Sequence, residues 1–407
     1  RIQYTSKAAG IANYWKKMIG ESRGIRQFDA VKKKEQFEQA FRGWAAGNPQ
    51  REAAYGKLLD QFSSAYQSYL PINLSSIYLS EAGQSIELVR FAAGFRSLVQ
   101  VSKKKDASRE DLSKALAQVK KAATDFYRNY SPAIDRRIAA SMLREMKKGM
   151  DPRWLPDVFT LISTRYGGDC DRYVTDLFEN SVFADSVKLS GLLDPFKPSR
   201  ASAIEKDPGY RLMTSIYEPW DKTIIPGLAV YSGIIDSLQR IYMAGQMEMQ
   251  KDKVFYPDAN STLRIAYGKV DDYSPADAVR YGFFTTLAGV IQKEDTTVYD
   301  YRVDPRLKKL FAGSDYGPYA DRDGTLHVAF TASNHTTGGN SGSPVLNARG
   351  ELIGINFDRN WEGTLSDLMY DPSKCRNISL DIRYCLFVVD RVAGCRRLVE
   401  EMELVQR

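Results

Sequence analysis

The residues with the clearest chemical meaning form a short glycine-rich segment around Ser341. Residues 339–344 read GNSGSP. A serine that performs acyl transfer needs its hydroxyl exposed on a tight loop, together with backbone N–H groups that point to the developing oxyanion. Gly339 and Gly342 let the backbone turn sharply and approach a substrate closely. We interpret Ser341 as a candidate nucleophile and the Gly339 and Ser341 amides as its oxyanion hole, although an ordinary Gly/Ser hairpin shares this short pattern.

The chain has two histidines, His327 and His335, that could act as the general base for such a serine. His335 lies six positions before Ser341, which favours a residue that lines the pocket or orders the loop. His327 lies in an apolar, strand-like run, and we interpret it as structural. The chain also begins abruptly at Arg1. We therefore expect a fragment, whose catalytic His and Asp belong to a part that precedes it.

Composition excludes several classes of protein. The 407 residues include 43% hydrophobic and 26% charged residues, which suffices for two or three folded domains and excludes a disordered chain. The net charge of +7 comes from basic residues that alternate with acids, so we expect no nucleic-acid partner. No apolar run is long enough to span a membrane. The four cysteines show no zinc spacing, so we expect no metal and no cofactor, and their disulfide state stays open.

The periodicity of apolar residues changes near residue 255. Residues 1–255 follow a helical period, with a capping box predicted at Ser108–Asp111 and a helix start at Ser131–Pro132. Strand-like runs follow at 262–267, 285–292, 326–332, 343–346, 351–357 and 378–389, and an amphipathic helix is expected at 392–404. The sequence thus predicts an α+β chain, with a helical domain at 1–255 and an antiparallel β domain at 256–407 that positions Ser341.

Two longer motifs resemble a known family. Residues 334–345 (NHTTGGNSGSPV) and 256–264 (YPDANSTLR) are similar to the bacterial serine exopeptidase family that holds dipeptidyl-peptidases 7 and 11. The resemblance covers essentially the whole chain. It implies a large α-helical capping domain followed by the second antiparallel β-barrel of a chymotrypsin-like double barrel. It also implies that the triad His and Asp lie in a missing N-terminal barrel segment.

The resemblance assigns binding of the substrate's free α-ammonium group to two residues. Asp358 matches the acid that holds this group, and Asn13 matches an asparagine of the helical domain that binds it as well. An exopeptidase that measures two residues from a cationic N-terminus needs such a negative counter-charge. Asp358 and Asn13 are therefore expected to define where the substrate begins.

The resemblance also assigns the specificity pocket. Arg359 matches the position that carries arginine in the branch cleaving after Asp or Glu, and glycine in the branch preferring apolar residues. A guanidinium is a natural bidentate partner for a carboxylate. We expect the strand that ends at Phe357 and the hydroxyls of Thr336 and Thr337 to line this pocket.

These features predict a serine exopeptidase that releases N-terminal dipeptides with Asp or Glu in the second position, through an acyl-enzyme on Ser341. The alternatives are a glutamyl endopeptidase, whose loop has the same residues, and a non-catalytic helical interaction module with a degenerate barrel. The family further implies oligopeptide substrates with a free N-terminus, a homodimer, and a secreted, periplasmic or cell-surface location in a Gram-negative bacterium. Without the triad His and Asp, this chain by itself would be nearly inactive.

Overall fold

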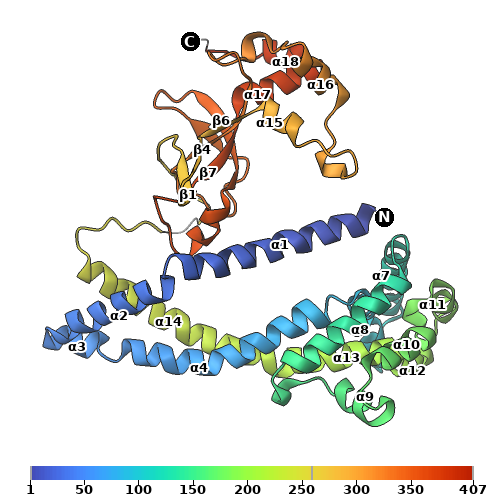
Figure 1. Cartoon of the computed structure of the whole chain (residues 1–407). Helices are drawn as coiled ribbons and strands as arrows, with labels where there is room; N and C mark the ends of the chain where they lie inside the picture. Colours follow the sequence, from blue (N-terminus) through green and yellow to red (C-terminus); the bar gives the residue numbers. More distant parts are fainter. Residues whose placement is uncertain (1, 258–259, 406–407) are drawn as a thin grey trace. The chain divides into compact units, whose positions relative to one another are not determined.

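The structure is a computed structural model that describes residues 2–257 and 260–405. It separates into two compact units, drawn with their elements in Figure 1. One unit, here the sheet unit, consists of Arg1–Phe37 and Tyr256–Arg407; the other, the helical unit, is Glu38–Phe255. The division differs from the boundary expected at residue 255, because the first helix groups with the C-terminal residues. Asp258 and Ala259, within the second resemblance motif, lie outside the described residues.

The helical unit contains twelve complete helices and most of α2 (Ala30–Ala46), which crosses the division. The complete helices are α3 (Pro49–Tyr55), α4 (Leu58–Ile77), α5 (Glu87–Ala93), α6 (Arg96–Lys103), α7 (Arg109–Tyr127), α8 (Pro132–Gly149), α9 (Val158–Tyr166), α10 (Cys170–Asn180), α11 (Ser186–Leu193), α12 (Ala201–Lys206), α13 (Pro208–Pro219) and α14 (Ile225–Met249). The capping box predicted at Ser108 is confirmed: its Oγ accepts from the Asp111 amide at 3.0 Å. Pro132 opens α8, as predicted.

Apolar packing holds the helical unit together. The long helices α4 and α14 pack side by side (Figure 1). Farther along the chain, Phe91, Phe95 and Phe183 meet edge to face inside a large core that spans most of the other helices. Phe95 and Phe183 are fully buried. Burial of such stripes, rather than the propensity of single residues, gives helices most of their stability.

The sheet unit is built on a five-stranded antiparallel sheet with strand order β3-β4-β7-β6-β5. Its strands are β3 (Phe284–Thr286), β4 (His327–Ala332), β5 (Pro344–Leu346), β6 (Leu352–Arg359) and β7 (Asn377–Asp381); a separate hairpin pairs β1 (Tyr273–Ala276) with β2 (Val279–Tyr281). The predicted strands at 326–332, 343–346 and 351–357 are therefore present. Gly350 has φ +80° in the β5–β6 turn.

The expected second barrel of a chymotrypsin-like double barrel is wrong for this structure. The sheet is open: β3 and β5 are three-residue edge strands, and no pairing among the described residues joins them. Three expected strand segments also differ. Residues 262–267 form no strand; the runs at 285–292 and 378–389 turn after short strands into α15 (Leu287–Gln292) and α17 (Ile382–Phe387). The Asp381 side chain explains the second change, because it accepts from the Arg383 amide at 2.9 Å and so caps α17.

Helices cover an apolar core beside the sheet. This core includes Leu287, Leu307, Leu326 and Phe387, contributed by α15, α16 (Pro305–Ala312), the segment before β4, and α17. The closing helix expected at 392–404 is shorter, α18 (Arg396–Glu400). Gly394, with φ +71°, breaks the helical path before it.

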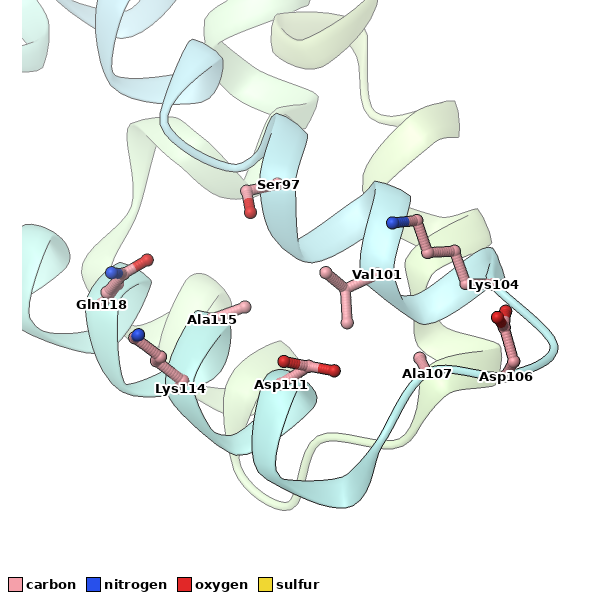
Figure 2. A pocket seen from close by; sticks show the side chains of 9 residues that line it. All are labelled: Ser97, Val101, Lys104, Asp106, Ala107, Asp111, Lys114, Ala115 and Gln118. Atoms are coloured by element: carbon pink, nitrogen blue, oxygen red, sulfur yellow. The ribbon is translucent and has the colours of Figure 1, made fainter.

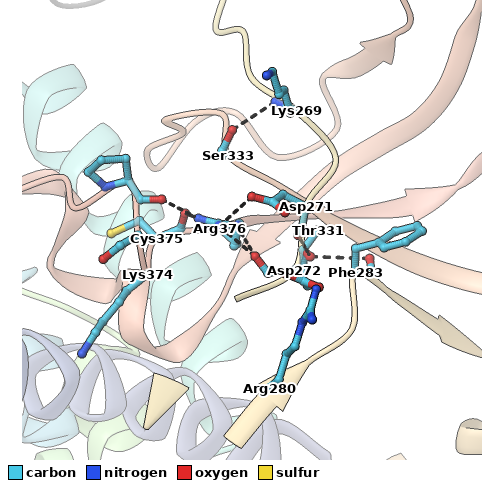
Figure 3. Close-up of polar contacts among 12 residues, drawn as sticks. Lys269, Asp271, Asp272, Arg280, Phe283, Thr331, Ser333, Lys374, Cys375 and Arg376 are labelled. Atoms are coloured by element: carbon cyan, nitrogen blue, oxygen red, sulfur yellow. Dashed lines mark hydrogen bonds and ion pairs between the residues drawn. The ribbon is translucent and has the colours of Figure 1, made fainter. Parts of the chain in front are cut away.

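Arg376 fixes the segment that precedes the small hairpin (Figure 3). Its side chain is nearly fully buried; Nη2 donates to the Asp271 carboxylate at 3.1 Å and to Asp272 O at 2.8 Å, and Nη1 donates to Pro372 O at 2.8 Å. On the neighbouring stretch the Ser333 amide donates to Lys269 O at 2.9 Å, and the Lys269 amide donates to Ser333 Oγ at 3.0 Å. Arg376 thereby holds two loops at the start of β7 in one geometry.

Helix α1 (Ile2–Gln27) packs on a 3-10 segment, η8 (Trp361–Asp367), within the sheet unit. The approach is close: a Cβ on Gly24 would lie 2.7 Å from the Leu365 Cβ, and one on Gly20 would clash with Thr364. Glycine at these two positions therefore lets α1 reach the segment that follows β6.

All four cysteines are free thiols, which answers the question of the disulfide state. In the described part of the chain, the helices are too short or too polar for any to cross a membrane.

Candidate active site

The segment around Ser341 forms a tight turn between β4 and β5. Gly339 and Gly342 have φ of +104° and +84°, in the left-handed region that favours glycine. The Ser341 side chain is exposed, and its Oγ donates to Phe357 O at 3.4 Å. The hydroxyl is therefore accessible to a substrate carbonyl, as acyl transfer requires.

The amides of Gly339 and Ser341 make no hydrogen bond within the described residues. By contrast, the Gly342 amide donates to Asn356 O at 2.7 Å, and the Asn340 amide donates to Thr337 O at 3.2 Å. Two unpaired N–H groups beside an exposed serine are the donors that an oxyanion would use. The assignment of the oxyanion hole remains a prediction with which this geometry is compatible.

His335 has partners for both ring nitrogens, and neither is Ser341. Its Nε2 donates to Ser366 O at 3.0 Å, because a carbonyl oxygen only accepts. Its Nδ1 lies 3.3 Å from the Tyr256 hydroxyl, which can then donate to it. The ring also packs against Tyr370, with centroids 4.7 Å apart. His335 thus ties the segment before Ser341 to η8 and is not positioned as its general base.

His327 lies on β4 and faces two carboxylates. Its Nδ1 and Nε2 are each 3.2 Å from a carboxylate oxygen, of Asp321 and Asp323 respectively. Hydrogen bonds from the Thr325 amide and hydroxyl lower the pKa of Asp323 to about 2. The imidazole stacks on Phe284 at 3.9 Å. These contacts fit a structural histidine.

A β-bulge at the end of β6 brings the predicted binding residues beside the serine. The register with β7 shifts between Asn356 and Asp358, so the extra residue is Phe357. Bulges re-aim side chains and are common beside active sites. Phe357 and Asp358 are both exposed, and the Phe357 carbonyl is the one that accepts from Ser341. Ser341 thus contacts the residue adjacent to Asp358.

Arg359 is already paired with a carboxylate. Its Nη1 and Nη2 donate to the two Asp367 oxygens at 2.7 Å each, and Nη1 also donates to Ser366 Oγ at 2.7 Å. The side chain is largely buried, at 17% exposure. The hydrogen bonds from Arg359 lower the pKa of Asp367, and the same contact raises the pKa of Arg359. In the described residues Arg359 Nε makes no hydrogen bond, so the edge formed by Nε and the outer Nη2 hydrogen retains its donors.

Asn13 is exposed on α1 and makes no side-chain hydrogen bond within the described residues. One helical turn later, Lys17 Nζ lies 3.6 Å from Asp367, the partner of Arg359. Because residues four apart share a helix face, Asn13 lies on the face that α1 turns toward η8. The sheet unit thus contains Asn13 together with Asp358, whereas the sequence interpretation put Asn13 in a separate helical domain.

The two threonines precede the turn. Thr336 is half-buried and Thr337 is exposed. The Thr337 amide donates to Asn340 Oδ1 at 2.9 Å, which closes the loop. Their proposed contact with a substrate carboxylate is not tested by this geometry.

Sequence reasoning missed the residues that support the predicted ones. Asp367 and Ser366 hold Arg359, and Lys17 extends this pair to α1. Asn356 and Asn377 lie under the serine loop. The available signal was polar residues at inward positions of otherwise apolar strands, but a single sequence does not show which loop such residues face.

A cavity of about 390 Å³ lies in the helical unit, between α6, α7 and the loop that joins them (Figure 2). Its charged side chains are Lys104, Asp106, Asp111 and Lys114. Asp111 is already used in the capping box. This cavity brings together balanced charges and no activated nucleophile, so Ser341 remains the candidate nucleophile. The part of the chain that the structure describes also has no group of three or more His, Cys, Asp or Glu that could hold a metal ion.

Comparison with known proteins gives consistent matches. The family model of peptidase S46 matches residues 1–404. The Asp/Glu-specific dipeptidyl-peptidase of Flavobacterium psychrophilum is 38% identical over the whole chain and 56% of its own length; dipeptidyl-peptidase 7 of Porphyromonas gingivalis is 36% identical over the whole chain and 55% of its length.

Among solved structures, Porphyromonas endodontalis DPP11 in complex with the dipeptide Arg-Glu matches 98% of this chain and 56% of its own, with 33% identity and a TM-score of 0.85. The chain therefore spans about half the length of the relatives it matches. These matches do not support the expectation of a missing N-terminal barrel segment.

Proposed function

Because the chain belongs to the peptidase S46 family, we propose that it carries the nucleophile and substrate-binding residues of a serine dipeptidyl-peptidase specific for Asp or Glu in the second position. One observation carries this proposal. The Ser341 hydroxyl contacts the backbone of the bulge at Phe357, and the next two residues are Asp358 and Arg359. The loop would thus supply the nucleophile, Ser341. The adjoining strand end would supply Asp358 as the anion for the substrate amine and Arg359 as the cation for an acidic side chain.

The reaction follows from these positions. The Ser341 Oγ adds to the carbonyl carbon of the second substrate residue as the hydroxyl proton passes to a general base. The resulting oxyanion accepts hydrogen bonds from the Gly339 and Ser341 amides. Collapse of this tetrahedral intermediate expels the shortened peptide, whose new amine takes the proton from the base. An acyl-enzyme remains on Ser341. Water then hydrolyses the ester and releases the dipeptide. The exposed Asp358 carboxylate would hold the substrate α-ammonium group, with Asn13 as a further donor or acceptor.

Arg359 would recognise the acidic side chain with its free edge. Asp367 occupies the end of the guanidinium, and this leaves Nε and the outer Nη2 hydrogen as a second two-pronged donor. A carboxylate that loses water in the pocket is costly unless it is paired, and this fork supplies the pairing. Lysine would bring charge without the fork. Thr336, Thr337 and Phe357 would complete the pocket.

The general base is a separate part of the proposal. Both histidines are committed to other partners: His335 to Ser366 and Tyr256, and His327 to Asp321 and Asp323. We therefore place the catalytic His, and the Asp that orients it, outside these 407 residues. Purified protein limited to residues 1–407 should be nearly inactive on peptide substrates; full activity of that protein would contradict this assignment.

Three further properties that the family resemblance implies stay predictions. They are oligopeptide substrates with a free N-terminus, a homodimeric assembly, and a periplasmic or cell-surface location. Light scattering on the purified full-length protein tests the dimer, and fractionation of the producing cells tests the location.

A matched pair of peptides distinguishes an exopeptidase from a glutamyl endopeptidase. The two peptides have the same sequence with Asp or Glu in second position, and one carries an acetylated N-terminus. The proposal predicts release of a dipeptide from the free peptide and little cleavage of the acetylated one, because Asp358 would then lack a cation to bind. Equal cleavage of both would favour the endopeptidase. No cleavage of either by the full-length protein would favour the non-catalytic module.

A further inference from the structure

A chain of buried polar side chains lies directly beneath the Ser341 loop. Asn356 on β6 is 6% exposed, and Asn377 and Ser379 on β7 are 3% and 0% exposed. The Asn356 Nδ2 donates to Asn340 O at 3.1 Å, and the Asn377 Nδ2 donates to Asn356 Oδ1 at 3.0 Å and to Ser379 Oγ at 3.3 Å. We call Asn356 and Asn377 the amide ladder. It connects the centre of the sheet to the residue before Ser341.

The direction of every bond in the amide ladder is determined by its first acceptor. The Asn340 carbonyl can only accept, so the NH₂ group of Asn356 must face it. The Asn356 Oδ1 therefore points to Asn377, whose NH₂ group must donate in turn. The orientation of both amides thus follows from the chemistry of the contacts.

Two donors hold the Asn340 carbonyl, the Asn356 Nδ2 group and the Ser343 amide at 3.0 Å, and they set the Ser341 amide through the peptide plane. The Asn340 C=O and the Ser341 N–H belong to one planar trans peptide group and point in opposite directions. A donor that holds the carbonyl toward the sheet therefore turns the N–H away from it. Two backbone bonds clamp the following residues: the Gly342 amide donates to Asn356 O at 2.7 Å, and the Asn356 amide donates to Ser343 O at 2.9 Å. Asn356 thus contacts the loop through its backbone amide, its backbone carbonyl and its side-chain NH₂ group.

We propose that Asn356 is a positioning residue that presets the Ser341 amide as an oxyanion donor, and that Asn377 orients Asn356. This inference rests on the proposed function, in which Ser341 is the nucleophile. An oxyanion donor must be in place before charge develops, because reorientation during the reaction would offset the stabilisation. The amide ladder supplies this preorganisation from the rigid centre of the sheet.

The Asn377 Oδ1 is buried and has no partner among the described groups. An unsatisfied buried amide oxygen costs free energy, whereas apolar side chains at paired positions of β6 and β7 would leave no such group. Retention of the amides is the arrangement expected if their directed bonds serve the loop above them.

Asn356→Asp tests the proposal because it keeps the shape and removes the donor. The introduced carboxylate, when ionised, would place a second acceptor against the Asn340 carbonyl and repel it. Only the Ser343 amide, which donates to Asn340 O at 3.0 Å, would still hold this peptide. In the full-length protein we expect kcat for an acidic dipeptidyl substrate to fall by up to about 1,000-fold, since complete loss of one oxyanion donor costs about 100- to 1,000-fold. A peptide boronate, which forms a tetrahedral adduct with the serine, should lose affinity in parallel, while Kd of the product dipeptide should change less than about threefold.

Asn347→Asp is the matched control. Asn347 lies in the β5–β6 turn, where its Nδ2 donates to Glu351, and the substitution is the same isosteric change in the same hairpin. It should shift thermal stability but leave the ratio of boronate affinity to dipeptide affinity unchanged. If Asn356→Asp does not fold, Asn377→Ala is measured in its place, with the same selective loss expected at a smaller size.

The outcomes are distinguishable. Wild-type kcat in the folded Asn356→Asp or Asn377→Ala variant would overturn the inference, as would a proportional loss of boronate and dipeptide affinity. If Ser341→Ala retained activity, the proposed function would fail first, and the boronate would show no dependence on Ser341.

Discussion

The two units of this protein use polar groups in their interiors in different ways. In the helical unit, buried carboxylates such as Asp135 and Asp207 accept from backbone amides at helix starts, and aromatic and aliphatic side chains fill the rest. In the sheet unit, Asn356, Arg376 and Asn377 are buried, and their hydrogen bonds go to loops and neighbouring side chains. Directional hydrogen bonds therefore make up more of the interior of the sheet unit than of the helical unit.

This difference indicates which unit must hold atoms in fixed places. Apolar packing is non-directional and tolerates substitutions of similar volume. Hydrogen bonds in a low-dielectric interior fix orientation, and a reaction centre needs orientation within a fraction of an ångström. The comparison predicts that substitutions around Ser341 reduce catalytic activity with little change in the free energy of unfolding. Substitutions in the helical core should reduce the free energy of unfolding with little change in activity.

Ser341→Ala should give the largest effect. Without the hydroxyl no acyl-enzyme forms, so we expect kcat/KM of the full-length protein to fall at least about 1,000-fold, with little change in thermal stability. Ser343→Ala is the control, since the contacts of Ser343 with Asn340 and Asn356 are made by its backbone. Activity that survives in Ser341→Ala would remove the reaction centre from the sheet unit.

Arg359→Gly should give the second-largest effect, a change in substrate specificity. Loss of the fork should cost about 2–5 kcal/mol against substrates with Asp or Glu in second position, which is about 30- to several-thousand-fold in kcat/KM. Substrates with Leu should be cleaved as well or better. Arg349→Gly, in the exposed β5–β6 turn, removes the same charge and should spare the preference. A preference that survives Arg359→Gly would contradict the pocket assignment.

Salt distinguishes a pocket from long-range attraction in the same experiment. The Debye length falls to about 3 Å at 1 M salt, so steering of anionic peptides by surface charge would fade. Contact with a largely buried guanidinium should persist. A wild-type preference that vanishes at 1 M salt would show that Arg359 only steers.

Phe95→Ala tests the opposite side of the comparison. Phe95 is fully buried and packs edge to face on Phe91 and Phe183, so the variant should lose about 3–5 kcal/mol of unfolding free energy. At temperatures where it stays folded, kcat/KM should remain within about twofold of wild type. Val187→Ala, at a position 78% exposed in the same unit, is the control. A selective loss of kcat in Phe95→Ala would show that the two interiors are not separable in this way.

Asp367→Asn should have the smallest effect, and it depends on pH. Arg359 lowers the pKa of Asp367 in the folded state, so the ionised pair stabilises the fold above the ordinary pKa of 3.8 and is lost as pH falls through the lowered value. We expect the free energy of unfolding of the wild type to exceed that of Asp367→Asn by about 1 kcal/mol near neutral pH. This difference should vanish in acid. Thermal unfolding at a series of pH values measures it; a difference that grows in acid would reverse the sign.

The fold could be predicted where the signal was local. Helical periodicity, the Ser108 capping box and the strand at Leu352 follow from neighbouring residues. The barrel was wrong because closure depends on partners for edge strands, which no local pattern encodes. At 262–267 the alternation of Leu263, Ile265 and Tyr267 predicted a strand, yet their side chains are at least 80% exposed and no ladder forms.

The candidate site shows the same division. Ser341 was identified from the turn chemistry around it, and Asp358 and Arg359 from resemblance. The prior pairing of Arg359 with Asp367 was not predicted, because it depends on how η8 folds back on β6. The approach of α1 to that pair through Lys17 depends on contacts between residues far apart in the sequence.

Labelling of the full-length protein with a fluorophosphonate tests the central claim most directly. The account predicts one adduct per chain, located by mass spectrometry on Ser341, blocked by a competing dipeptide with Glu in second position and absent from Ser341→Ala. An adduct on another residue, or no adduct on a protein that still releases dipeptides, would contradict it.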